Sequence, residues 1–399
     1  MSETTNLIRT TTSAPTGTRQ RHVAALDGLR ALAVLAVILY HTGQLPFGWL
    51  GVPLFFALSG HFITRTLLNH QELTRGRRAA NFFRNRALRL APLYYLFLIV
   101  LTVLALVGYG HGTIGRDLPY LWTGTWDLSA MLPSFQPTPL VLYAHLWSLG
   151  VEVQLYVVWA VLTLLLPRRW FVRAVVVLAL AGPLLRLGVW LALQVAGYPN
   201  EALAPMVVYC NPVSYLDVFA IGACTALPEV RSRLAPVARA AIGLFVLTVA
   251  ALVSYGLITG TGTWTDLGFP VILFEHYDWV WKYSIAALFF GALVYYAGED
   301  NVFARTLRAR PLVRLGLISY GIYLLHVPLF GQLSRLHEPT TGWTAADLLL
   351  TAATVGGTWL LAEVSYRFVE RPFLRLKKGS LAQELPRSPR ADDASVIPV

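Results

Sequence analysis

The chain has 399 residues, of which 56% are hydrophobic and only 13% are charged. Average soluble domains carry about 25% charged residues, so the composition excludes a disordered chain, a coiled coil and an ordinary cytosolic enzyme. A net charge of +11 would suggest nucleic acid in a soluble protein. Cys210 and Cys224 have neither CxxC nor metal-ligand spacing, so no metal site and no thiol chemistry are predicted. These values favour an integral membrane protein.

Ten stretches are long and apolar enough to cross the bilayer, which takes about 20 residues. They are residues 26–45, 47–68, 90–108, 146–166, 174–196, 213–228, 240–258, 282–298, 315–333 and 346–366. The sixth and eighth are short and carry polar residues. Residues 1–24 lack the pattern of a cleaved signal peptide, so span one is predicted to be an uncleaved anchor. The fold class predicted is an all-α, polytopic bundle of about ten transmembrane helices.

The basic residues predict the orientation of this bundle. Arginines gather before span one and after spans two, four, six and eight, with Arg116 and Arg335 as the main exceptions. Because basic loops stay inside, both termini are predicted to be cytoplasmic, in a multi-pass plasma-membrane protein. The +11 charge then predicts no nucleic-acid partner. The domains expected are a disordered cytoplasmic segment 1–24, a membrane domain 25–373 and a disordered cytoplasmic tail 374–399.

Span one contains Arg30 and His41, eleven residues apart. Eleven residues are close to three helical turns, so both side chains lie on one face, about 16 Å apart along the axis. One interpretation is a packed histidine with an arginine that reaches the cytoplasmic boundary. The other is a general base deep in a cavity that is entered from the cytoplasm, because the ordinary pKa of histidine lies near neutrality.

Span four carries a polar stripe in which Ser148, Glu152 and Tyr156 recur every four residues. Glu152 falls at a depth similar to that of His41. One interpretation is a structural carboxylate that pairs with an arginine such as Arg186 in span five. The other is a carboxylate that orients a catalytic histidine, and the two roles are compatible.

Span nine carries Ser319, Tyr323 and His326 on one helical face, and Asp217 opens span six. These groups face a cavity if the spans converge, because polar groups in hydrocarbon usually face a bundle interior. His326, and His61 in span two, could instead be histidines packed in the core, which is the more common outcome for a lone histidine.

The loop 70–92 is the most basic stretch, and Arg86 and Arg89 share one helical face there. Charge alone favours a role in topology and lipid contact. The alternative is a phosphate-bearing ligand, which arginine binds through paired hydrogen bonds.

Six stretches in order, over residues 22 to 373, resemble the acyltransferase-3 family of bacterial integral membrane O-acyltransferases. The first is Arg30 and His41 at the family's spacing, and the second is Phe55-Phe-Ala-Leu-Ser59-Gly. The others are the paired arginines Arg86 and Arg89, Trp147-Ser-Leu-Gly-Val-Glu152, Ser319 through His326, and Tyr366 through Phe373.

This resemblance implies transfer of an acyl group, commonly acetyl from acetyl-CoA, to a hydroxyl. It implies His41 as the catalytic histidine, Arg30 as its essential partner, and Arg86 and Arg89 as binders of the CoA donor. The sequence departs from the family at Pro53, His61 and Tyr215, positions that line the presumed cavity. The choice of acceptor or of acyl group is therefore expected to differ from that of the glycan-modifying members.

The function predicted is an acyl-CoA-dependent O-acyltransferase, with His41, Arg30 and Glu152 as catalytic residues and no metal. Its partners are the lipid bilayer, acyl-CoA and a hydroxylated acceptor, either a glycan or a small metabolite such as a macrolide. The alternative is a transporter or exporter of a glycolipid or small metabolite. The residues predicted to line the cavity are Ser59, His61, Ser148, Tyr156, Asp217, Ser319, Tyr323 and His326.

Overall fold

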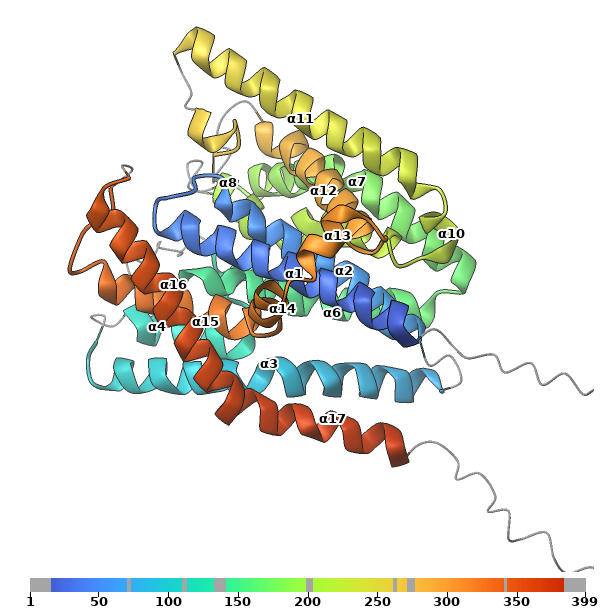
Figure 1. Cartoon of the computed structure of the whole chain (residues 1–399), viewed down its shortest axis with the longest axis horizontal. Coiled ribbons are helices and arrows are strands. Elements are labelled where there is room, and N and C mark those ends of the chain that lie inside the picture. Colours follow the sequence, from blue (N-terminus) through green and yellow to red (C-terminus); the bar gives the residue numbers. More distant parts are fainter. Residues whose placement is uncertain are drawn as a thin grey trace, which may run out of the picture.

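The structure is a computed structural model that describes residues 16–69, 73–109, 113–132, 141–198, 204–260, 264–270, 277–340 and 343–383. Every regular element among these residues is a helix (Figure 1), which confirms the all-α prediction. The long helices are α1 (Thr16–His41), α2 (Gly51–Leu68), α3 (Arg75–Leu106), α6 (Trp147–Leu165), α7 (Arg168–Val195), α11 (Leu234–Thr259), α12 (Asp278–Ala297) and α16 (Ala345–Ser365).

Each of these eight helices, some with a flanking turn, is long and apolar enough to cross a membrane. Two bent pairs of helices raise the number of candidate spans to as many as ten. Helices α8 (Ala204–Cys210) and α9 (Leu216–Cys224) meet at 57° through the turn Pro212–Tyr215, and α14 (Arg310–Leu317) and α15 (Ser319–Leu333) meet at 73°. The predicted ten spans correspond to these eight helices and two bent pairs.

Shorter helices complete the chain. They are α4 (Thr113–Thr123), α5 (Trp126–Ser129), α10 (Pro228–Arg231), α13 (Val302–Leu307), α17 (Arg371–Gln383), the 3₁₀ turns Gly48–Leu50, Val141–Leu146 and Trp264–Asp266, and the π-helical turn Tyr366–Glu370 that joins α16 to α17.

Helix α2 is the most buried of the candidate spans and α11 the least, with 78% and 11% of their apolar windows inside the protein. Helix α2 packs on α9 at close range because both contribute a glycine at the crossing. A Cβ on Gly60 would lie 2.0 Å from the Phe219 carbonyl oxygen, and one on Gly222 would lie 1.9 Å from that of Ala57. Small residues allow such close helix contacts in membranes.

The outer helices present apolar side chains to their surroundings. Leu106 on α3, Leu180 on α7, Leu247 on α11 and Leu360 on α16 are each more than half exposed. Monomeric soluble proteins rarely expose apolar surface on this scale. The exposed apolar side chains and the span lengths together define the surface of a protein that lies in a bilayer.

The described ends of the chain lie at the same end of the bundle. In Figure 1 the start of α1 and the end of α17 both lie at the right, and α17 runs beside the first half of α3. Helix α1 begins at Thr16 and α17 continues to Gln383, so parts of the segments predicted to be disordered are helical. The rest of those segments, residues 1–15 and 384–399, lies outside the described residues.

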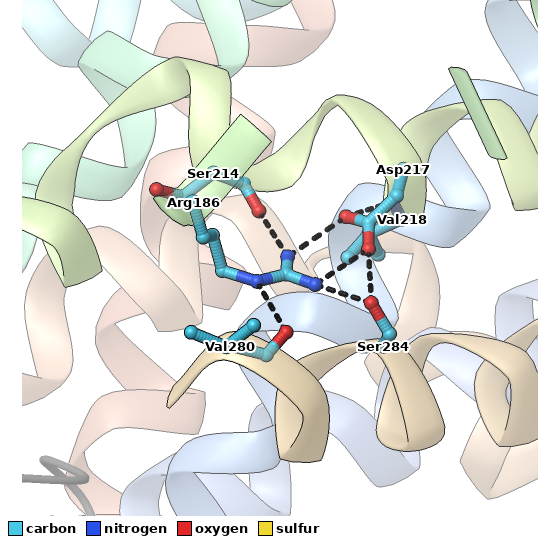
Figure 2. A network of polar contacts seen from close by, with 6 residues as sticks. All are labelled: Arg186, Ser214, Asp217, Val218, Val280 and Ser284. Atoms are coloured by element: carbon cyan, nitrogen blue, oxygen red, sulfur yellow. Dashed lines mark hydrogen bonds and ion pairs between the residues drawn. The ribbon is translucent and has the colours of Figure 1, made fainter. Parts of the chain in front are cut away.

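A fully buried ion pair joins three helices (Figure 2). Arg186 of α7 donates to both carboxylate oxygens of Asp217 on α9, at 3.1 and 2.9 Å, and also binds Ser284 of α12. The Ser214 and Val280 carbonyl oxygens accept its remaining N–H groups. A Cβ at Gly182 would lie 1.8 Å from the Asp217 carboxylate, so this position requires glycine. The proposed pairing of Arg186 with Glu152 is therefore wrong.

Candidate active site

Five helices, α1, α2, α3, α6 and α15, enclose a narrow cavity of about 70 Å³. It collects nine of the predicted site residues, which come from distant parts of the sequence. They are Arg30, Ser59, Arg86, Arg89, Ser148, Glu152, Tyr156, Ser319 and Tyr323. The stripe on α6 and the stripe on α15 thus face the same space as the arginines.

One end of the cavity is strongly basic. Arg30 pairs with Asp27 one turn earlier on α1, at 3.1 Å, and its guanidinium lies over the Phe62 ring at 4.3 Å. Arg86 and Arg89 have no hydrogen bond or ion pair to any other described residue, although Arg86 lies over the Tyr156 ring at 5.3 Å. Unpaired arginines in a cavity are suited to bind an anion such as a phosphate, which arginine contacts through two parallel hydrogen bonds.

Glu152 lines the same cavity as the three arginines. Its Oε1 accepts hydrogen bonds from the Ser59 hydroxyl and the Tyr156 hydroxyl, both at 2.5 Å. These bonds hold the carboxylate one helical turn before Tyr156 on α6, in the cavity that the arginines also line. Among the described residues Glu152 makes no hydrogen bond to His41, so it does not orient that histidine directly.

The other end of the site is a cluster of three histidine rings. His41, at the end of α1, lies 4.9 Å from the ring of His326 on α15, and His145, in the turn before α6, lies 5.2 Å from His326. His326 and His145 are almost wholly buried, whereas His41 is partly exposed. Tyr323 connects this cluster to the cavity, because its hydroxyl lies 2.5 Å from that of Ser148 and its ring contacts His326.

Two predicted residues lie elsewhere. His61 on α2 contacts the Thr225 hydroxyl at 2.7 Å, at the buried end of α9. Asp217 belongs to the ion pair with Arg186 described above. Neither is among the residues that line the cavity. His41 and His326 of the histidine cluster are also outside its lining, and Tyr323 lies between them and the cavity.

Two residues of the site were not selected from the sequence. Tyr320 lines the cavity and donates to the Leu90 carbonyl oxygen at 2.8 Å, which ties α15 to α3. His145 belongs to the histidine cluster. The sequence feature that could have indicated His145 is its position three residues before Ser148. That spacing does not predict the 3₁₀ turn Val141–Leu146 in which His145 lies.

A second, apolar cavity of about 310 Å³ adjoins the first between α3 and α6. Arg86, Leu90, Glu152 and Tyr156 are among the residues that line both. Its rim includes side chains exposed on the outer surface of the bundle, among them Tyr95 and Trp122, whose rings stack at 5.5 Å. The site is therefore connected to the side of the bundle that faces lipid.

Asp127, on the short helix α5, lies buried beside the start of α6. Its carboxylate accepts two hydrogen bonds from the Gln154 amide, at 3.0 and 2.9 Å, but burial raises its pKa from 3.8 to about 6. The folded protein thus holds the proton more tightly than the unfolded chain, so stability should fall as pH rises from about 4 to 6.

The Asp127→Asn variant should not lose stability as the pH rises from about 4 to 6, because it has no carboxyl group to ionise at this position. We expect it to melt at the same temperature as the unaltered protein near pH 4 and at a higher temperature above pH 7. At about 1.4 kcal/mol per pKa unit, the difference is at most about 3 kcal/mol. Thermal unfolding in detergent across this pH range measures it. Parallel melting curves of the two proteins at all pH values would contradict the assignment.

Comparison with known proteins identifies the family. A family model described as an acyltransferase domain, acyltransferase 3, matches residues 23–363. The chain belongs to this family, and its eight to ten candidate membrane spans fit a multi-pass plasma-membrane protein. This membership argues against the alternative of a transporter.

Two relatives carry more specific names. The chain is 27% identical over 373 residues to the peptidoglycan O-acetyltransferase OatA of Listeria monocytogenes, covering 88% of this chain and 56% of the relative. It is 27% identical over 390 residues to the O-acetyltransferase OatA of Staphylococcus aureus, covering 91% and 60%. The chain thus spans little more than half the length of these relatives. No solved structure matches it.

Proposed function

We propose that the protein transfers an acetyl group from acetyl-CoA to a hydroxyl of a cell-surface glycan. The observation that carries the proposal is the arrangement of the site, with unpaired arginines at one end and His41 at the other. Arg86 and Arg89 would bind CoA phosphates together with Arg30. His41 lies about 16 Å further along the axis of α1, where the thioester would lie.

The transfer step would take place at His41, beyond the arginines that bind the donor. The Nε2 of His41 would accept the proton of the acceptor hydroxyl as that oxygen attacks the thioester carbonyl carbon. The carbon–sulfur bond then breaks, and the proton passes from His41 to the CoA thiolate. Glu152, held by Ser59 and Tyr156 between the arginines and Ser148, would shape the passage rather than accept the proton.

The orientation proposed places the arginine end in the cytoplasm. The start of α1, the start of α3 and the end of α17 lie at one end of the bundle, and α3 and α17 carry many of the basic residues of the chain. Because basic segments stay inside, both termini and the donor site would be cytoplasmic. His41 would then lie in the outer half of the membrane, toward an acceptor on the outer surface.

The acceptor proposed is a glycan because the relatives include a peptidoglycan O-acetyltransferase. The second cavity favours another candidate. Its apolar lining and its exposed rim suit an acceptor that enters from the bilayer, such as a hydrophobic hydroxylated metabolite of the macrolide class. Purified protein with labelled acetyl-CoA and either acceptor separates the two, and label in neither product would contradict the proposal.

The Arg86→Gln and Arg89→Gln variants test the donor site. Each loses charge-assisted hydrogen bonds that contribute about 1.5–3 kcal/mol, so KM for acetyl-CoA should rise about 10- to 100-fold with little change in kcat. Steady-state kinetics in detergent measures both parameters. Arg75→Gln, an exposed arginine at the start of the same helix, is the matched control.

A donor without phosphates sharpens this test. An acetyl thioester of pantetheine should be used equally well by the unaltered protein and by both variants, because it has no phosphate to lose. If the two substitutions raise KM for this donor as much as they raise KM for acetyl-CoA, the arginines do not bind phosphate.

A further inference from the structure

His41 needs a partner at its Nδ1 if its Nε2 is to act as a base, and Glu152 is not that partner. Two groups approach Nδ1. The Val37 carbonyl oxygen lies 2.9 Å away on the same helix, and Nε2 of His326 lies 3.3 Å away across the interface with α15. The two rings meet edge to face, with an interplanar angle of 71°.

The backbone determines where the protons lie. A carbonyl oxygen only accepts hydrogen bonds, so a ring nitrogen bonded to it carries the proton. Nδ1 of His326 lies 2.6 Å from the Tyr323 carbonyl oxygen, so neutral His326 has a bare Nε2 that faces His41. Nδ1 of His41 faces the Val37 carbonyl and therefore carries its own proton, which leaves Nε2 free as the base.

A proline holds the third ring. Pro328 has no N–H, so the Leu324 carbonyl one turn earlier lacks its usual helical partner. Nε2 of His145 occupies that place at 3.2 Å and must carry a proton. His145 therefore packs against His326 in one fixed tautomer and limits the orientations that the His326 ring can adopt.

We infer that His326 is the positioning residue of His41 and acts as a neutral imidazole. This inference rests on the proposed function. When His41 takes the hydroxyl proton on Nε2, its Nδ1–H is shared between the Val37 carbonyl and the bare Nε2 of His326. A protonated His326 would instead point an N–H at the N–H of His41, so His326 stays neutral while His41 gains and loses its proton.

The side-chain rings that contact this pair belong to tyrosine and histidine residues. The titratable side chains that face the two rings are Tyr40 on α1, His145 before α6, and Tyr323 on α15. Among the described residues no carboxylate or basic side chain hydrogen-bonds to either ring. The proton on His41 is thus stabilised by a carbonyl and a neutral imidazole rather than by a carboxylate.

Two replacements of His326 distinguish positioning from packing. The amide of His326→Gln can still donate to the Tyr323 carbonyl and accept from His41, whereas His326→Leu does neither. We expect His326→Leu to lower kcat about 10- to 100-fold, as loss of an orienting group does at other sites, with KM for acetyl-CoA unchanged. The acid limb of its pH–rate profile should move to lower pH, because the imidazolium of His41 loses an acceptor. His326→Gln should restore both properties.

Controls separate the possible failures. His337→Gln replaces a histidine that contacts Asp347 at the end of the bundle, and it should leave the kinetics unchanged. Equal losses in the Gln and Leu variants, with an unmoved pH profile, would overturn the positioning role and indicate packing alone. If the unaltered protein transfers no acetyl group, the proposed function fails instead.

A measurement on the unaltered protein does not depend on whether the variants fold. The ¹⁵N chemical shifts of labelled histidine at neutral pH report which ring nitrogen is protonated. We expect a protonated Nδ1 in His41 and His326 and a protonated Nε2 in His145. A protonated Nε2 in His326 would contradict the inference.

Discussion

The His41→Ala variant is expected to lose acetyl transfer by about 10²–10⁴-fold in kcat, which is the usual contribution of a general base. KM for acetyl-CoA should change little, because Arg86 and Arg89, the proposed phosphate ligands, are untouched. The side chain of His41 is partly exposed at the end of α1, so its removal should not unfold the bundle. Initial rates with labelled acetyl-CoA, at equal amounts of folded protein, measure the loss.

The matched control for His41 is again His337→Gln, which should transfer acetyl at the unaltered rate. A rate for His41→Ala within about twofold of that rate would remove His41 from the chemistry. A rise in KM without loss of kcat would assign it to binding.

The Arg186→Met variant is expected to lose about 3–5 kcal/mol of stability, because it leaves the carboxylate of Asp217 buried without its partner. Both side chains are fully buried, so water cannot replace the lost bonds. The apparent melting temperature in detergent should fall by about 4–6 °C.

The double variant Arg186→Met with Asp217→Leu tests the reason for this loss. Replacing a whole buried pair by apolar residues is often close to neutral, so the double variant should recover much of the lost stability. The kinetics of the folded fraction should stay unchanged, because the pair lies outside the cavity. A double variant as unstable as the single one would show that the other hydrogen bonds in Figure 2 matter more than the charge.

The spans could be predicted because hydrocarbon requires long apolar helices. Eight of the ten predicted regions are single helices of sufficient length, and the other two are bent pairs. The breaks in two of them were harder to predict. Asn211 followed by Pro212 is a turn signal, and it lies where α8 and α9 meet at 57°. The bend at Ile318, between α14 and α15, lies between Gly316 and Ser319 and has no proline, so the sequence indicates it only weakly.

The relative positions of site residues could be predicted where the residues lie on one helix. Arg30 and His41 share a face of α1, and Ser148, Glu152 and Tyr156 share a face of α6, as helical periodicity requires. The sequence could not reveal which helices lie side by side. The pairing of Asp217 with Arg186, the bonds from Ser59 to Glu152, and the contact of His41 with His326 all depend on the order of helices around the bundle.

The central claim is that one chain holds acetyl-CoA at its cytoplasmic end and removes the acceptor proton near the opposite face. The most direct test uses proteoliposomes with labelled acetyl-CoA outside and an acceptor glycan sealed inside. Protease access to a tag at the C-terminus identifies the molecules whose termini face outward. We predict that these molecules, and not those of opposite orientation, acetylate the enclosed glycan. Acetylation only of glycan on the same side as acetyl-CoA would contradict the account.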